Sequence, residues 1–183
     1  MTESMEFTQR LGEIFGIELK DYFAKQTLDV MVQLAKQDDC RQVGYFAVAL
    51  TAEDCLIDAE RINKIFSWVC AHILFEKDPM VLWKGVPTPS EYIKTPCRML
   101  AEIRKKGYTS GDCDDQAVFL AACFYALGLK PGFVAISNPG SERLDHVFAF
   151  ASDRERKLLI AVDPQGDKYD LSAYRGKRMM TFL

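Results

Sequence analysis

The sequence lacks the features of a membrane, secreted or nucleic-acid-binding protein. None of its apolar runs approaches the roughly 18 residues of a membrane-spanning helix. Residues 1–10 are polar and contain no apolar core of a secretory signal. The net charge of −3 gives no reason to expect a nucleic-acid or anionic-membrane partner. We therefore expect a cytoplasmic protein that binds neither nucleic acid nor membrane.

Metal-binding cysteine pairs are missing as well. None of the six cysteines forms a C-x-x-C pair, so a zinc site of ordinary spacing is not expected. Without an export signal, we expect reduced thiols. Most of them lie in apolar helical patterns, where cysteine acts as a small hydrophobic residue. The six are Cys40, Cys55, Cys70, Cys97, Cys113 and Cys123.

Histidine is scarce, which limits the choice of a catalytic base. The chain has two histidines, His72 and His146. His72 lies in a stretch with helical spacing, where a structural role is the simpler interpretation. Any mechanism that pairs a cysteine with a histidine therefore points to His146.

The length and composition indicate one ordinary globular domain. The 183 residues are 49% hydrophobic and 27% charged. We expect residues 1–26 to form a lead-in segment, with a short helix around Phe7 to Phe15, and residues 27–183 to form a single domain. The sequence contains no internal repeats and no low-complexity segments.

The first half of the domain has mostly helical periodicity. A helix is expected from Thr27, with that residue as its cap, and a second is expected after Asp38-Asp39 as far as Leu50. Cys55 to Phe75 is the longest helical candidate. Residues 78–96 contain four prolines and a glycine and are expected to be irregular. A helix from Pro96 to Lys105 follows, since proline suits a first helical position.

The chain is organised around a helix that is apolar on all sides. Every residue from Ala117 to Leu127 is apolar, which is typical of a helix buried at the centre of a protein. Asp112 and Asp115 suit a capping box at its start, and Gly128 suits the left-handed position after its end. Cys113 therefore lies on the first turn of a buried helix.

The remaining chain has the alternation of β-strands. Four segments fit strands, and the connections between them favour an antiparallel sheet. The sequence thus predicts an α+β fold, in which a helical half and the central buried helix pack on a small antiparallel sheet. The expected strands are 132–137, 146–151, 158–163 and 178–182.

Two of these strands bring a histidine next to an aspartate. If the hairpin turns around residues 152–157, Ala151 lies opposite Leu158 and His146 lies opposite Asp163. Opposed residues in an antiparallel pair have Cβ atoms roughly 4.5–5.5 Å apart. An imidazole held by a carboxylate is the base of a nucleophilic triad. Asp145 points to the other face of its strand, so Asp163 is the better partner.

Cys113 is the candidate nucleophile, and its neighbours have opposing effects. A helix N-terminus and a nearby imidazolium favour a thiolate. Asp112, Asp114 and Asp115 disfavour it, unless their carboxylates turn back onto backbone N–H groups. The backbone N–H of Cys113 is also available to an oxyanion at the helix start.

These residues resemble the core of the transglutaminase-like superfamily. The resemblance lies in Gly111-Asp112-Cys113-Asp114-Asp115, in the apolar helix that ends at Gly128, in His146-Val147 at the start of a strand, and in Val162-Asp163-Pro164. It extends over roughly residues 27–164 and is most similar to the bacterial and phage-borne members. The superfamily implies a papain-like fold, in which the cysteine lies on a helix and the histidine and aspartate lie on adjoining strands.

The resemblance implies a thiol-dependent acyl-transfer enzyme of the cysteine protease or amidase type. Cys113 matches the nucleophile, His146 the base and Asp163 the residue that orients it. An aromatic or amide side chain often supports the oxyanion in this superfamily, and Trp83 or Gln116 is the candidate here. Because a chain of this length has no accessory β-domains, hydrolysis is favoured over transamidation. A peptide, protein or small amide is the expected substrate, and no cofactor or metal is required.

Two other interpretations remain open. The chain could be a catalytically silent interaction or assembly module, of phage or prophage origin, that keeps the same fold. It could also be a metal-dependent hydrolase that uses Asp112, Asp114 and Asp115, although capping accounts for two of these residues. Cys123 lies ten residues into the helix and is expected to be a core residue.

Overall fold

The structure is a computed structural model that shows the α+β fold expected from the sequence. The helices are α2 (Leu19–Lys36), α3 (Arg41–Thr51), α4 (Asp58–His72), α5 (Pro96–Lys106) and α6 (Cys113–Ala126). The strands are β1 (Ile73–Phe75), β2 (Met80–Trp83), β3 (Val86–Pro89), β4 (Thr109–Gly111), β5 (Gly132–Ile136), β6 (His146–Asp153), β7 (Leu158–Val162) and β8 (Arg178–Phe182). The described residues are 19–36, 41–53, 55–89, 92–137, 144–153, 158–165 and 178–183.

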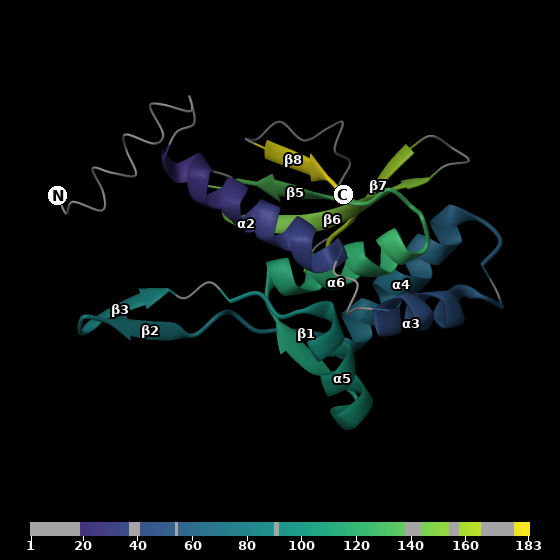
Figure 1. Ribbon diagram of the computed structural model, residues 1–183, viewed down its shortest axis with the longest axis horizontal. Helices are drawn as coiled ribbons and strands as arrows, with labels where there is room; N and C mark the ends of the chain where they lie inside the picture. Colours follow the sequence, from purple (N-terminus) through teal and green to yellow (C-terminus); the bar gives the residue numbers. More distant parts are fainter. Residues whose placement is uncertain are drawn as a thin grey trace.

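Helix α6 is the centre of the fold, as its apolar sequence predicts. It packs against β6 of the four-stranded sheet and against each of the helices α2, α3, α4 and α5 (Figure 1). All its residues from Asp114 to Phe124 are buried. The helix ends at Ala126, and Gly128, two residues later, has a φ of 71° in the left-handed region that glycine adopts without strain. This placement fixes the position of Cys113, the first residue of α6.

The main sheet is antiparallel, with strand order β7-β6-β5-β8. Alternate residues of β6 face different cores, because side chains in a strand alternate between its two faces. Val147, Ala149 and Ala151 belong to the large core that includes α6. Phe148 and Phe150 belong to a second cluster with residues of β5 and β7. The small alanines of β6 thus allow α6 to lie close to the sheet.

Two helix boundaries differ from the sequence prediction. Helix α2 begins at Leu19, so Thr27 lies inside a helix and does not cap it. The 18-residue α2 is also longer than the 15-residue α4. The stretch predicted as one helix to Phe75 ends at His72, and β1 then pairs in parallel with β4. The predicted helix at Phe7 to Phe15 and the residues Asp38-Asp39 lie outside the described residues.

The segment predicted to be irregular, residues 78–96, contains a β-hairpin. Strands β2 and β3 pair with each other and project away from the helices (Figure 1). Lys84 and Gly85, which connect them, have φ values of 51° and 80°, as a tight primed turn requires. The hairpin exposes apolar side chains, including Leu82 at 74%. Across the described chain, the helices are too short or too polar to cross a bilayer.

Candidate active site

His146 and Asp163 meet directly, as the sequence predicts. The imidazole Nε2 lies 2.5 Å from Asp163 Oδ2. His146 begins β6, and Asp163 directly follows β7. The side chain of His146 is 13% exposed and that of Asp163 is 2% exposed. Because Asp163 occupies Nε2, Nδ1 is the nitrogen that could take a proton from a substrate or a thiol.

The strand register that joins them differs from the prediction by two residues. Ala151 lies opposite Ile160 and not opposite Leu158, as the predicted hairpin required. The two residues therefore meet diagonally and not as directly opposed partners. A shift of two residues keeps every side chain on its face, and a diagonal neighbour is still within reach of a histidine ring.

A chain of hydrogen bonds connects Asp163 to the first turn of α6. The backbone N–H of Gln165 donates to Asp163 Oδ1 at 2.9 Å, and the side chain of Gln165 lies 3.4 Å from Gln116 Oε1. Gln116 Nε2 in turn donates to the carbonyl of Ile73 at 3.0 Å. The carboxylate that holds His146 is thereby tied to α6 one turn after Cys113.

The Cys113 side chain contacts the backbone of β6, the strand that His146 begins. Its partly buried thiol interacts with the backbone N–H of Val147, the residue that follows His146. No hydrogen bond joins Cys113 to His146, both of which the structure describes. By alternation His146 continues the row of Phe148, whose ring centroid lies 6.0 Å away, whereas Cys113 packs against the core with Val147. The thiol thus lies against the backbone of Val147, whereas the imidazole is held by Asp163.

The surroundings of Cys113 oppose a thiolate. Burial raises the pKa of its thiol from 9.0 to about 12, and the negative charges of Asp112 and Asp114 act in the same direction. The N–H groups of Val147 and of Cys113 itself lower the pKa and only partly offset this rise. The effects that oppose a thiolate at Cys113 therefore outweigh those that favour it.

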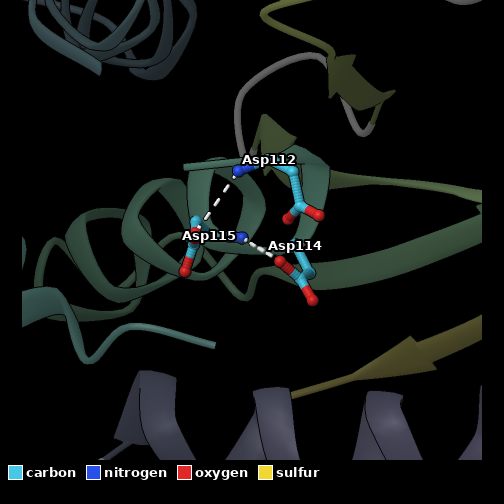
Figure 2. Close-up of side chains that lie close together, drawn as sticks. All are labelled: Asp112, Asp114 and Asp115. Carbon is cyan, nitrogen blue, oxygen red and sulfur yellow. Dashed lines mark hydrogen bonds between the residues drawn. The ribbon is translucent and has the colours of Figure 1, made fainter. Parts of the chain in front are cut away.

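The three aspartates around Cys113 form a compact acidic group (Figure 2). Each offers an oxygen, and these oxygens lie within 4.8 Å of one another. Asp115 Oδ2 accepts from the N–H of Asp112 at 3.3 Å, which is the return half of a capping box, and the N–H of Asp115 donates to Asp114 Oδ1 at 2.7 Å. Asp112 Oδ1 is buried and, among the described residues, lacks a partner. Since helix-start hydrogen bonds engage two of the three carboxylates, we assign no metal here.

The other candidate residues have different surroundings. Trp83 lies at the turn of the β2–β3 hairpin, where it pairs with Val86, and this hairpin projects away from α6 (Figure 1). Gln116 is buried, and both ends of its amide make the hydrogen bonds given above. His72 stacks on Trp68 and bonds its carbonyl at 2.8 Å, which is a structural role. Cys123 is fully buried in the core, as expected.

Two residues near the site have no recognisable sequence signal. Lys94 donates its backbone N–H to Asp115 Oδ1 at 2.6 Å from the segment before α5. Gln165 follows the Asp163-Pro164 turn and satisfies the second oxygen of Asp163. Both act partly through the backbone, so their side-chain types give no sign of these contacts.

Comparison with known proteins gives a likeness of fold only. No family model and no curated protein matches the sequence. A solved structure described as "a putative protease" from Parabacteroides distasonis matches with a TM-score of 0.53 and 14% identity. The match covers 80% of this chain and 30% of the other, so this chain spans less than a third of that protein's length.

Proposed function

We propose that the protein is a thiol-dependent acyl-transfer enzyme that cleaves amide or peptide bonds through Cys113, His146 and Asp163. The observation that carries this proposal is the contact of His146 with the buried Asp163, at the strand start where Val147 meets the Cys113 thiol. The sequence resemblance to the transglutaminase-like superfamily supports it, as does the fold of the solved neighbour described as "a putative protease".

In the proposed reaction, the Cys113 sulfur attacks the amide carbonyl while His146 Nδ1 takes the thiol proton. The tetrahedral intermediate collapses to a thioester, and the imidazolium returns the proton to the leaving amine. Water then attacks the thioester with His146 as the base, which yields a carboxylic acid and the free thiol. Asp163 orients the imidazole throughout, as in other triads. An amine in place of water would give transamidation, which we regard as the less favoured outcome.

The test compares the wild-type protein with Cys113→Ala on mixed peptide and amide libraries, with product amines and acids measured by mass spectrometry. We expect turnover by the wild type and by the matched control Cys70→Ala, which removes an exposed thiol from α4. Cys113→Ala should retain no thiol-dependent turnover. Equal turnover by Cys113→Ala and the wild type would refute the proposal.

A second candidate, a catalytically silent interaction or assembly module, is favoured by one observation. The pKa of the Cys113 thiol is raised to about 12 by burial and by its acidic neighbours, which suits a cysteine that performs no chemistry. A phage or prophage origin would fit this candidate as well as the enzyme.

The dependence of Cys113 on His146 distinguishes the two candidates. The rate of Cys113 alkylation by iodoacetamide, followed by peptide mapping, should fall in His146→Ala if the imidazole assists the thiol. A silent module predicts the same Cys113 rate in both proteins. Exposed Cys70 provides the reference rate within each sample.

A further inference from the structure

The carboxylate of Asp115 joins two separate parts of the chain next to Cys113. Its Oδ1 accepts from the backbone N–H of Lys94 at 2.6 Å, and its Oδ2 accepts from the backbone N–H of Asp112 at 3.3 Å (the latter in Figure 2). Asp112 immediately precedes Cys113, and Lys94 lies between the β2–β3 hairpin and α5. The residue is 1% exposed. A helix cap needs only the bond to Asp112, so the bond to Lys94 goes beyond capping.

The surrounding chain leaves room for this carboxylate and surrounds it with donors. A Cβ at position 111 would lie 2.3 Å from Asp115 Oδ2, so only glycine fits there. The Lys94 ammonium donates to the carbonyl of Ser110. Lys94 therefore contacts the segment before Cys113 with its side chain and the helix turn after it with its backbone.

We propose that Asp115 is a positioning residue that holds the first turn of α6 against residues 92–95 and so fixes the Cys113 sulfur next to Val147, the residue that follows His146. Hydrogen bonds to a charged carboxylate are stronger than those between neutral groups, so these two bonds favour one placement of a single helical turn. Asp115 need not touch the substrate. The inference deepens the proposed function and rests on it only where turnover is measured.

The test is Asp115→Asn, because an amide has one acceptor oxygen for the two N–H groups and presents a donor to one of them. The matched control is Asp58→Asn. Asp58 is also a buried aspartate in the first turn of a helix, α4, where its Oδ1 accepts from Arg61 Nη1 at 3.4 Å. Iodoacetamide alkylation of the folded proteins is followed by mass spectrometry at three thiols. These are Cys113, the exposed Cys70 and Cys123, which is buried further along α6.

In Asp115→Asn we expect Cys113 to be alkylated about tenfold faster, the change for about 1.4 kcal/mol of lost restraint. The Cys123 rate should be unchanged, and Asp58→Asn should alter the rate of neither Cys113 nor Cys123. An unchanged Cys113 rate would overturn the proposal. A rise in the alkylation rates of both Cys113 and Cys123 would also overturn it, since it would mean that the whole of α6 has become less tightly packed.

A second pair of variants keeps the proposal testable if Asp115→Asn does not fold. Lys94→Pro removes the backbone donor and the ammonium, whereas Lys94→Met removes the ammonium alone. Lys94→Pro should raise the Cys113 rate and Lys94→Met should not. Equal Cys113 rates in the two variants would overturn the proposal.

The split between kcat and KM distinguishes a positioning residue from a merely structural one. On any amide that the wild type cleaves, Asp115→Asn should lower kcat about tenfold and leave KM within about twofold, because only the position of the nucleophile changes. If the wild type shows no turnover but Asp115→Asn selectively raises the alkylation rate of Cys113, the proposed function is refuted and the positioning role is supported. Turnover by the wild type, together with an unchanged alkylation rate of Cys113 in Asp115→Asn, would support the proposed function and refute the positioning role.

Discussion

The two halves of the candidate site are built in opposite ways. On the sheet, the His146 imidazole meets a buried carboxylate, and the other oxygen of Asp163 is satisfied by the N–H of Gln165. On the helix, the Cys113 thiol has two negative carboxylates nearby, those of Asp112 and Asp114. The sheet half orients an imidazole, and the helix half raises the pKa of the thiol.

The magnitudes show which effect decides the state of Cys113. A helix N-terminus stabilises a negative charge by about 0.3–1 kcal/mol. A rise in pKa from 9.0 to about 12 corresponds to roughly 4 kcal/mol against the thiolate. A position on the first turn of a helix is therefore not enough to make Cys113 a thiolate. A reaction at Cys113 would need His146 to remove the proton during the attack, which makes the sheet half indispensable.

The largest expected effect comes from breaking the sheet half. Asp163→Ala leaves His146 without its orienting carboxylate, and we expect kcat/KM on a cleaved amide to fall about 10³- to 10⁴-fold. Asp145→Ala is the matched control, since it removes an exposed carboxylate next to His146 in the sequence. A similar loss in both variants would mean that Asp163 has no special part in the reaction.

The features that were predictable from the sequence are those set by local patterns. An apolar run between an acidic start and a glycine identified α6, and alternation identified strands β5 to β8. The contact of His146 with Asp163 was predictable despite the wrong register, because an error of two residues keeps both side chains on one face. An error of one residue would have separated them.

The features that were not predictable depend on contacts between distant segments. The extension of β1 beyond α4 depends on pairing with β4, which lies more than thirty residues further along the chain. The hairpin was hidden by its prolines, although Lys84-Gly85 is a turn signal. The side from which Cys113 approaches β6 depends on the packing of α6, which no spacing in the sequence encodes. For that reason the relation between Cys113 and His146 could not be derived from their positions in the sequence.

A smaller effect is expected from the pH dependence of the helix half. Burial raises the pKa of Asp115 from 3.8 to about 6, so the folded chain holds this proton more tightly than the unfolded chain. The contribution to stability is present below about pH 4 and is lost as the pH rises towards 6. We expect the free energy of unfolding to fall by about 2 kcal/mol across this window, relative to Asp115→Asn. Urea denaturation at pH 4, 5, 6 and 7 measures it, and parallel curves for the two proteins would contradict it.

The smallest effect tests whether charge or burial suppresses Cys113. Asp112→Asn removes one of the charges that raise the pKa of the thiol and keeps the shape of the side chain. At pH 8 we expect iodoacetamide to alkylate Cys113 about fivefold faster, which corresponds to roughly 1 kcal/mol. Asp29→Asn removes an equal charge from the exposed face of α2 and should leave the rate unchanged, whereas an equal rise would indicate an effect of net charge. Because burial is the larger cause, Cys113 in Asp112→Asn should still react more slowly than the exposed Cys70. A Cys113 that overtakes Cys70 would instead mean that the acidic neighbours alone keep the helix half of the site inactive.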